Sequence, residues 1–387
     1  MLNYNRHSID HKEIKAVIKT LKSNFLTQGP KVEEFENKLK EYCKSKYATC
    51  VNSATSALHI SCISLGLKKN DILWTVPNTF VASVNCGLYC EAKIDLIDIN
   101  QKDFNLDIDL LEKKLKDSEK KKQLPKILVV VHLGGEPCNL KKIHKLKKKY
   151  KFKVIEDASH ALGSIYYDSK IGSCKYSDVT VFSFHPVKNI TTGEGGAILT
   201  NNKFIDQKCK ILRTHGIEKV FKNLKTKIRS VFYYEQQMLG YNYRMNDIEA
   251  SIGIEQLKKI DLFIKKKIQK ANYYINNFDK NIFNLRKLDN NCLNSYHLFI
   301  LSIKKRINLK TYTKIFNKIR NKNIGINLHY LPIHKQPYFK PMFKNIKFKV
   351  SENYSKQSFS IPLFHNISQK QQDYVIENIT QIVKKNI

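Results

Sequence analysis

The chain has 387 residues, of which 42% are apolar, and this is enough for a large domain with its own core and a smaller second domain. No apolar run approaches the ~18 residues of a membrane-spanning helix, and the first residues lack the apolar stretch of a signal peptide. The nine cysteines form no CxxC pair, so we expect reduced thiols in a cytoplasmic protein and no metal site.

The net charge of +34 raises the question of nucleic-acid binding. However, the lysines are spread along most of the chain, and the abundance of asparagine and isoleucine is typical of a general compositional drift. No zinc finger, RNP1-like aromatic motif or clear helix-turn-helix is present. Charge alone is weak evidence for nucleic-acid binding, and we expect it to favour anionic substrates instead.

The first predicted elements are helices at residues 14–21 and 32–42, where apolar residues recur at helical spacing. The turn between them, residues 27–30 (TQGP), has two interpretations. It is either a helix stop followed by a proline start, or a loop that contacts a substrate. Spacing alone leaves both open.

A helix that runs to about Gly66 begins after the small hydroxyl residues of the segment 52–58 (NSATSAL). Free N–H groups and the positive end of the helix dipole make such a start a candidate phosphate site. An ordinary N-cap explains the same residues without any ligand. Neither a GxxxxGK[ST] motif nor a GxGxxG motif after a strand is present, so both nucleotide fingerprints are absent.

Predicted strands then alternate with helices, as in an α/β protein. The strands lie at residues 72–76, 92–99, 127–131 and 154–155, with helices at 106–115 and 140–150 and a charged loop at 118–123. Phe80 follows the first strand, where it could stack on a planar ring or pack in the core. Asp157 ends the last strand, and this is the end at which open α/β sheets bind ligands. It could equally cap the next helix.

Lys188 lies in a polar turn between two apolar runs, residues 179–184 and 197–199. It has no charged neighbour in the sequence, and three glycines follow it within the turn. A desolvated lysine has a lowered pKa and can form an imine with a carbonyl. A solvated or salt-bridged lysine is the ordinary interpretation. The residues that accompany Lys188 must decide between the two interpretations.

The pattern of predicted elements changes in the second half of the chain. A structured loop rich in tyrosine, asparagine and arginine is predicted at residues 231–247, followed by a long amphipathic helix at 248–275. A strand at 296–303 and helices at 309–319 and 369–383 come after it. We therefore predict a large domain over residues 1–255 and a smaller C-terminal α+β domain over 256–387.

Four of these signals point to one cofactor. A helix start for a phosphate, an aromatic residue for a ring face, a carboxylate for a ring nitrogen and a lysine for an aldehyde are together what pyridoxal 5′-phosphate (PLP) requires. The carboxylate keeps the pyridine nitrogen protonated, so that the ring withdraws electrons from the reacting carbon.

The same segments carry a resemblance to a known family. Residues 156–163 (EDASHALG), 183–188 (SFHPVK) and 193–196 (GEGG) resemble the sugar-nucleotide aminotransferases of the DegT/DnrJ/StrS family. Residues 27–30, 53–58 and 240–247 support this resemblance, which spans nearly the whole chain. Residues 2–10 and 329–338 (HYLPIHKQPY) most resemble the branch of the family that acts in the pseudaminic acid pathway.

The resemblance implies PLP fold type I, like that of aspartate aminotransferase, with a mostly parallel central sheet. It also implies a homodimer with the active site at the subunit interface. Lys188 would hold PLP covalently and move the proton, and Asp157 would pair with the pyridine nitrogen. The other implied cofactor residues are Thr55, Ser56 and Ser183 at the phosphate, Phe80 on the ring, His160 near the phenolic oxygen, and Asn242 from the other subunit. The implied substrate-binding residues are Tyr4, Gln28, Gly29, His329, His334 and Tyr338.

The implied reaction moves an amino group from L-glutamate to C4 of a UDP-linked 4-keto-6-deoxy-2-acetamido sugar. Relatives that replace the lysine with histidine are dehydratases, so Lys188 favours transamination. Two alternatives stay open from sequence: an aminotransferase for another nucleotide-linked 3- or 4-keto sugar, and a PLP-fold protein with a regulatory or binding role and no turnover.

Overall fold

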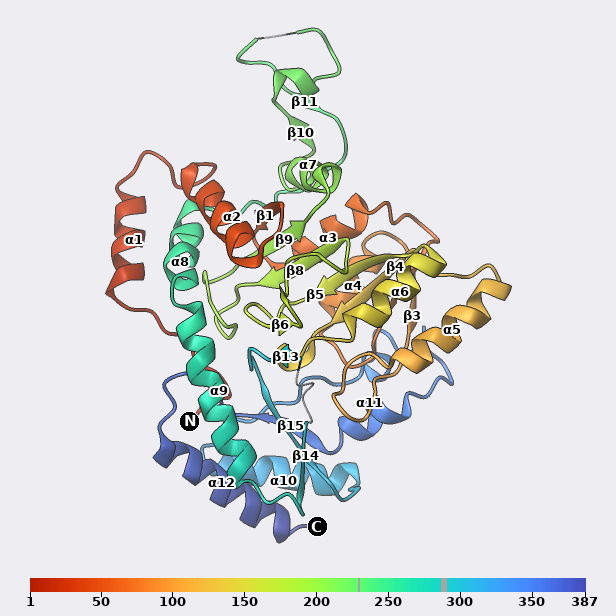
Figure 1. Ribbon diagram of the computed structural model, residues 1–387, viewed down its shortest axis with the longest axis vertical. Coiled ribbons are helices and arrows are strands. Elements are labelled where there is room, and N and C mark those ends of the chain that lie inside the picture. Colours follow the sequence, from red (N-terminus) through yellow and green to blue (C-terminus); the bar gives the residue numbers. More distant parts are fainter. Residues whose placement is uncertain (229, 287–290) are drawn as a thin grey trace.

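A large mixed sheet organises the first two thirds of the chain, as the computed structural model in Figure 1 shows. The structure describes residues 1–228, 230–286 and 291–387, and in these residues the sheet has seven strands in the order β1-β9-β8-β5-β4-β2-β3. The strands are β1 (Tyr47–Val51), β2 (Ile72–Thr75), β3 (Lys93–Leu96), β4 (Ile127–Val131), β5 (Lys153–Asp157), β8 (Val179–Ser183) and β9 (Gly196–Thr200). Strands β8, β5, β4, β2 and β3 are parallel, whereas β9 and β1 are antiparallel to their neighbours.

Strand β4 shows why these residues form the centre of the sheet. Ile127 and Val129 pack in the core cluster on one face, whereas Leu128 and Val130 pack in the cluster on the other face, and all four are fully buried. Fully burying such a side chain contributes roughly 1.5–3 kcal/mol. A strand with two buried faces appears in sequence as a continuous apolar run, which is typical of parallel sheets.

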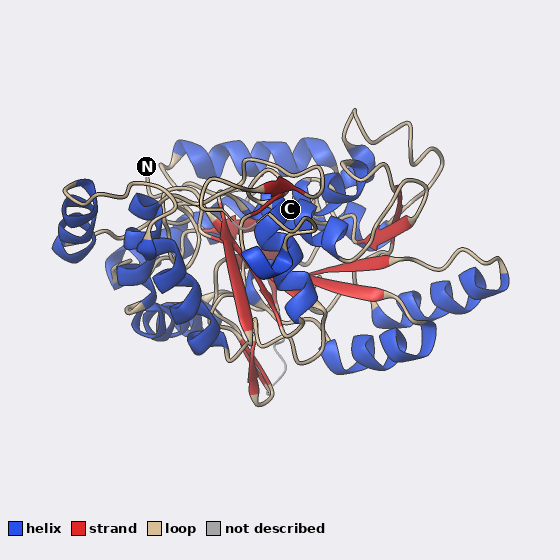
Figure 2. Cartoon of the chain, turned by 90° about the horizontal axis from the view of Figure 1, so that it is seen from above, coloured by secondary structure: helices blue, strands red, loops and turns tan. Residues whose placement is uncertain are grey.

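Helices lie on both sides of the strands (Figure 2). One face packs against α3 (Ala54–Ser64), α4 (Ala82–Leu88) and α7 (Lys203–Leu212). The other face packs against α2 (Pro30–Cys43), α5 (Ile108–Lys120), α6 (Leu140–Tyr150) and α8 (Asp247–Leu257), with α1 (His11–Leu21) against α8. Helix α5 continues to Lys120, so the predicted loop at 118–123 is wrong at its start.

A second, antiparallel sheet is formed by residues after 282, with its own core. Its strands are β12 (Phe283–Leu285), β14 (Phe299–Ile303) and β15 (Ser358–Ile361), and its helices are α9 (Ile260–Asn277), α10 (Leu309–Asn321) and α12 (Gln369–Lys384). Helix α11 (Lys349–Tyr354) packs instead in a core cluster of the large sheet, through Tyr354. Tyr274, Phe283 and Phe359 are fully buried in this core. The predicted single helix at 248–275 is two helices, α8 and α9, separated at Lys258 and Lys259. The division of the chain after residue 255 stays a prediction.

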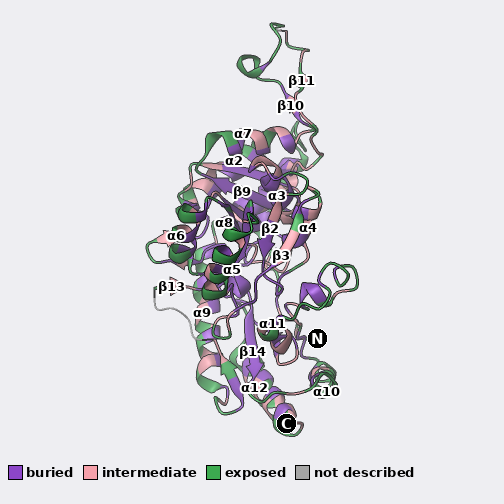
Figure 3. Ribbon diagram, turned by 90° about the vertical axis from the view of Figure 1, so that its right-hand side faces the viewer, coloured by how far each residue is buried: buried purple, intermediate pink, exposed green. Residues whose placement is uncertain are grey.

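Two segments of the first two thirds of the chain lie away from the large sheet. The first residues lie against the C-terminal sheet, because Leu2 pairs with Ile324 and the Leu363 N–H donates to the Tyr4 carbonyl. The pair β10 (Ile217–Glu218) and β11 (Glu235–Gln236) begins an arm that projects from the molecule (Figures 1 and 3) and is largely exposed. Short elements complete the chain: η1 (Leu133–Gly135), β6 (Ile165–Tyr166), β7 (Ser169–Lys170), η2 (Phe221–Asn223), β13 (Cys292–Leu293) and η3 (Ile333–Lys335). Within the described ranges, no helix has the length and apolar character to cross a membrane.

Candidate active site

A cavity of about 550 Å³ opens where the parallel strands of the large sheet end. Strands β4, β5 and β8 end with Val131, Asp157 and Ser183, and all three residues line the cavity. Parallel neighbours have their carboxyl ends at the same edge, which is where open α/β sheets bind ligands. Tyr4 and the segment 327–330, from outside the large sheet, contribute further lining.

Asp157 presents a fixed carboxylate to this cavity. Its Oδ2 accepts a hydrogen bond from Ser83 Oγ at 2.6 Å, and its Oδ1 accepts from Ser159 Oγ at 2.6 Å and from the Ser159 N–H at 3.2 Å. Ser83 is in turn hydrogen-bonded to Thr79 at 2.8 Å. Hydrogen bonds to a carboxylate are stronger than those between neutral groups, so this group is well placed to pair with a cation or a protonated ring nitrogen.

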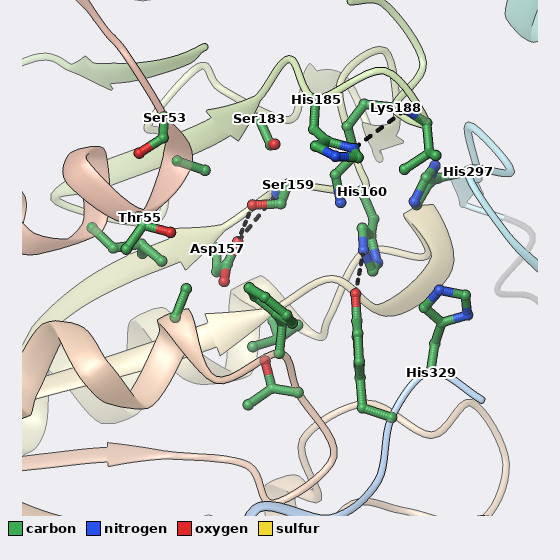
Figure 4. A pocket seen from close by; sticks show the side chains of 18 of the residues that line it. Ser53, Thr55, Asp157, Ser159, His160, Ser183, His185, Lys188, His297 and His329 are labelled. Carbon is green, nitrogen blue, oxygen red and sulfur yellow. Dashed lines mark hydrogen bonds between the residues drawn. The ribbon is translucent and has the colours of Figure 1, made fainter. Parts of the chain in front are cut away.

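Lys188 lies in the turn after β8 and lines the same cavity as Asp157 (Figure 4). It forms no ion pair with any residue that the structure describes. Burial lowers the pKa of Lys188 to about 8, and the negative charge of Asp157 opposes part of that shift. A larger uncharged fraction at neutral pH makes the amine a better nucleophile.

The N-terminus of α3 supplies a candidate anion site at another side of the cavity. Ser53, Thr55 and Ser183 line the cavity, and Figure 4 shows all three facing it. Gly196 begins β9 directly against this helix start, because a Cβ at Gly196 would lie 2.6 Å from the Ala54 nitrogen. The close approach of β9 therefore fixes the helix N-terminus, where free N–H groups and the dipole favour an anion.

Ser56 is not brought to the cavity, although the sequence analysis places it at the phosphate. Its hydroxyl donates to Asn52 Oδ1 at 2.7 Å, and its N–H donates to Ser53 Oγ at 3.1 Å. These bonds belong to the cap of α3, so they turn the Ser56 side chain away. Ser53, which the sequence analysis did not name, lines the cavity beside Thr55.

Aromatic and imidazole rings make up much of the remaining wall. Phe80 lines the cavity and is 55% exposed, so a face of its ring is accessible to a planar ligand. His160 and His329, both named from sequence, line it together with His297, which was not. Burial lowers the pKa values of His160 and His297 well below the usual range of histidine, and it lowers the pKa of His329 to about 3. The positive charge of Lys188 lowers the pKa of all three histidines further. The three imidazoles are therefore neutral at physiological pH.

Three of the predicted residues lie at a different place in the same chain. Gln28 and Gly29 line a separate hollow of about 350 Å³. Asn242 pairs with Thr214, which lines that hollow too. The turn at 27–30 is held there because the Gly29 N–H donates to Asp247 Oδ2 at 2.9 Å. Within one copy of the chain, these residues therefore lie apart from the cavity that contains Lys188.

The two remaining substrate candidates are also outside the cavity. His334 is buried, with its Nε2 3.0 Å from Glu352 Oε1 and its ring against Phe348. Tyr338 is 68% exposed and packs on Phe339. The structure therefore brings together Lys188, Asp157, Thr55, Phe80, His160, Ser183, Tyr4 and His329 of the predicted site. The functional roles of all these residues stay predictions.

Other lining residues were missed by the sequence analysis. Ser159 is inside the segment 156–163 and Tyr330 inside 329–338, so both motifs carried a usable signal. His185 and Glu194 lie in the lysine turn and were likewise within reach. His297, just before β14, has no motif around it, and only the fold brings it to Lys188.

Comparison with known proteins decides the family. A family model for the DegT/DnrJ/EryC1/StrS aminotransferase family matches residues 7–380. The chain belongs to this family. The prediction of family membership and of an aminotransferase is confirmed at this level.

Individual relatives of the family cover the whole chain. The chain is 37% identical over 386 residues to the UDP-4-amino-4,6-dideoxy-N-acetyl-beta-L-altrosamine transaminase of Campylobacter jejuni, covering 100% of this chain and 98% of that protein. It superposes on Helicobacter pylori PseC, an aminotransferase involved in the biosynthesis of pseudoaminic acid, with a TM-score of 0.89, 28% identity and 99% coverage of both chains. The PLP-form of the putative sugar aminotransferase Spr1654 from Streptococcus pneumoniae gives a TM-score of 0.88 at 26% identity, covering 99% of this chain and 98% of that one. The predicted α/β fold, with its mostly parallel sheet, is confirmed.

Proposed function

We propose that this protein is a PLP-dependent aminotransferase that moves an amino group from L-glutamate to C4 of a UDP-linked 4-keto-6-deoxy-2-acetamido sugar. The products are the UDP-4-amino sugar and 2-oxoglutarate. The observation that carries the proposal is the cavity in which Lys188 and Asp157 meet, in a chain that matches an aminotransferase family over residues 7–380. The relatives named above supply the substrate class.

The residues around the cavity fit PLP. A half-buried amine with a lowered pKa faces a carboxylate that three hydrogen bonds hold in place. Ser53 and Thr55 at the start of α3, with Ser183 at the end of β8, suit a phosphate, and Phe80 offers a ring face. Bound PLP supplies an aldehyde that carries the amino group between the two substrates and a ring that withdraws electrons from the reacting carbon.

Lys188 has two tasks in this proposal. Its Nζ would hold the cofactor covalently between turnovers and, when free, would act as the general acid and base that moves the substrate's proton. Asp157 keeps the pyridine nitrogen protonated. Neither task requires a charged lysine in the resting state, which agrees with a pKa of about 8 for Lys188.

The proposal includes a homodimer whose subunits complete each other's active sites. In support of it, Gln28, Gly29 and Asn242 gather at a hollow apart from the Lys188 cavity of their own chain. The arm that follows β10 exposes Val231, Phe232 and Leu239 by 99%, 80% and 77%, an apolar surface that a second copy would cover. His329 and Tyr4 would contact the sugar from within the chain, and His334 and Tyr338 stay candidates for it.

The proposal also includes a division into domains at residues 1–255 and 256–387 and a cytoplasmic location. The separate core of the C-terminal sheet supports the division. The buried thiols and the nucleotide-linked substrate support the location. The basic surface suits a substrate that carries a pyrophosphate.

The test incubates the purified, PLP-supplied protein with L-glutamate and a panel of UDP- and dTDP-linked 3- and 4-keto sugars, with products identified by mass and NMR. We expect a 4-amino sugar from the UDP-linked 4-keto-6-deoxy-2-acetamido substrate, and 2-oxoglutarate in equal amount. Amination of another keto sugar alone would correct the substrate. A stable PLP complex without amino transfer to any sugar would favour a binding or regulatory protein and overturn the proposal.

A further inference from the structure

The ring of His160 uses both of its nitrogens for hydrogen bonds within the protein. The Gly134 N–H donates to His160 Nδ1 at 3.2 Å, and His160 Nε2 lies 3.0 Å from the Tyr330 hydroxyl, a contact drawn as a dashed line in Figure 4. Gly134 has φ of 68°, a left-handed conformation that glycine adopts without strain, and this turns its N–H toward the imidazole. The ring is therefore fixed from both sides.

These two contacts determine where the imidazole proton lies. A neutral imidazole has one donor nitrogen and one acceptor nitrogen, and burial keeps His160 neutral by lowering its pKa. Because the Gly134 N–H occupies the lone pair of Nδ1, the ring proton is on Nε2. His160 therefore donates to the Tyr330 oxygen and has no hydrogen-bonding atom left for a ligand.

The direction of that bond leaves the Tyr330 proton available. Tyr330 Oη accepts from His160, so its own O–H needs an acceptor elsewhere, and no acceptor for it is found in residues 1–228, 230–286 and 291–387. Tyr330 lines the cavity that contains Lys188 and Asp157. A hydroxyl that accepts one hydrogen bond is a stronger donor of the next.

The position of the Tyr330 ring is held by its surroundings. Its backbone N–H donates to Asn78 Oδ1 at 2.8 Å, and Asn78 is fully buried after β2. The ring lies nearly parallel to that of His160, with an interplanar angle of 19° and 6.0 Å between centroids, and it contacts Phe80 at 5.9 Å. A donor held in this way loses little entropy when it binds a ligand oxygen.

We propose that Tyr330, and not His160, donates the hydrogen bond to the phenolic oxygen of the cofactor, with His160 as a positioning residue that orients the Tyr330 hydroxyl. The inference rests on the proposed function, since it assumes that PLP occupies the cavity. It revises the role that the family resemblance gives to His160.

The donor has a measurable effect on the bound cofactor. A hydrogen bond to the phenolic oxygen stabilises its negative charge, which weakens the attraction between that oxygen and the proton on the linkage to Lys188. Loss of the donor therefore makes this linkage hold its proton to higher pH. Because a hydrogen bond to a charged group is stronger than one between neutral groups, the expected rise is about one pH unit, or tenfold in the proton affinity.

The experiment titrates the absorbance of the lysine-bound cofactor with pH in the holoenzyme and in three variants. Tyr330→Phe removes only the hydroxyl, and we expect its titration midpoint to rise by about one pH unit. His160→Leu leaves the hydroxyl in place without its orienting donor, so a smaller rise is expected. Tyr273→Phe removes a hydroxyl that donates to Asp373 on α12, outside the cavity, and should leave the midpoint unchanged.

The ranking of the variants decides between the two residues. A larger rise for His160→Leu than for Tyr330→Phe, or no change for Tyr330→Phe, would overturn the proposal. Far-UV circular dichroism and the thermal midpoint show that each variant is folded. Borohydride reduction with peptide mapping locates the pyridoxyl tag in a separate measurement. A tag on Lys188 together with an unchanged midpoint for Tyr330→Phe would overturn this inference alone. The absence of a tag on Lys188 in the wild type would overturn the proposed function.

Discussion

Two lysines of this chain are largely removed from water, and their surroundings differ. Lys188 lines the cavity beside Asp157, and burial lowers its pKa to about 8. Lys267, on α9, is 3% exposed, and burial lowers its pKa to about 7. Its Nζ donates to Asn189 Oδ1 at 3.1 Å, so it lies directly behind the turn that presents Lys188.

The difference shows that a lowered pKa does not by itself identify a reactive lysine. The pKa of Lys267 is the more strongly lowered of the two, but Lys267 is buried and forms no ion pair with a carboxylate in the described part of the chain. Lys188 has a cavity in front of it and the charge of Asp157 acting on it. Access for a ligand and a fixed counter-charge therefore distinguish a candidate catalytic group from a structural one.

Exchanging each lysine for an uncharged side chain separates the two roles most strongly. We expect Lys188→Ala to abolish amino transfer, because the covalent anchor and the proton carrier are both lost. We expect Lys267→Met to retain turnover within about tenfold, since only a hydrogen bond behind the turn is removed. Turnover is measured with glutamate and the preferred keto sugar, and circular dichroism confirms folding. Near-normal turnover by Lys188→Ala would refute its assignment.

The pH dependence of stability should identify Lys267 as a group that opposes folding when charged. A folded pKa of about 7 lies below the ordinary lysine value, so the unfolded chain binds more protons between pH 7 and pH ~10.5 and stability rises with pH over that window. The free energy of unfolding of the wild type should gain on the order of 5 kcal/mol relative to Lys267→Met across it.

Urea unfolding of both proteins at several pH values, with the same cofactor content, measures this difference. The Lys188 contribution is common to both proteins and cancels. Parallel pH profiles would mean that Lys267 is solvated or paired in solution.

The carboxylate of Asp157 distinguishes the surroundings of Lys188 from those of Lys267, and its charge can be removed without a change of side-chain shape. Asp157→Asn keeps the volume but cannot hold a proton on the pyridine nitrogen, so we expect turnover to fall roughly 100-fold. The amide oxygen can accept both hydrogen bonds from Ser159 while the amide nitrogen donates to the Ser83 hydroxyl, and this favours a folded variant. Stopped-flow rates of each half-reaction measure the effect, and a loss under about threefold would remove Asp157 from the proposed chemistry.

Substitution of a residue that hydrogen-bonds to the turn around Lys188 should give the smallest effect, a small loss of stability. Asn5 Nδ2 donates to the Val187 carbonyl at 2.5 Å, and Asn189 Nδ2 donates to the Leu162 carbonyl at 3.0 Å. Asn5→Ala removes the first of these bonds and is expected to lower the free energy of unfolding by about 1 kcal/mol. Thermal melts measure the change, with Asn378→Ala on α12, whose Nδ2 donates to the Tyr374 carbonyl at 2.9 Å, as a matched control. An equal change in both variants would show that Asn5 contributes nothing specific.

The sequence predicted the parts of the site that depend on local order. Asp157 and Lys188 are 31 residues apart in the chain, but each follows a buried strand, and β5 and β8 are parallel neighbours whose carboxyl ends meet. Continuous apolar runs and glycine-rich turns are strong signals because they arise from backbone geometry and burial within a few residues. The strands and the lysine turn could be located for that reason.

What escaped prediction depends on long-range packing. His297 reaches the cavity only because residues 292–298 pass beside β6 and η1, which no local pattern encodes. The break between α8 and α9 at Lys258 and Lys259 interrupts a helical pattern that continues in the sequence. The roles of His160 and Tyr330 depend on one backbone N–H, that of Gly134, which no motif indicates.

The attachment of the first residues to the last third of the chain has a consequence for biosynthesis. Leu2 pairs with Ile324, and Tyr4, a wall residue of the cavity, binds the Leu363 N–H. A ribosome that adds roughly 5–20 residues per second emits Tyr4 on the order of half a minute before its partner strand exists. The large sheet can form during translation, but the wall that contains Tyr4 is completed only once residue 363 has been synthesised.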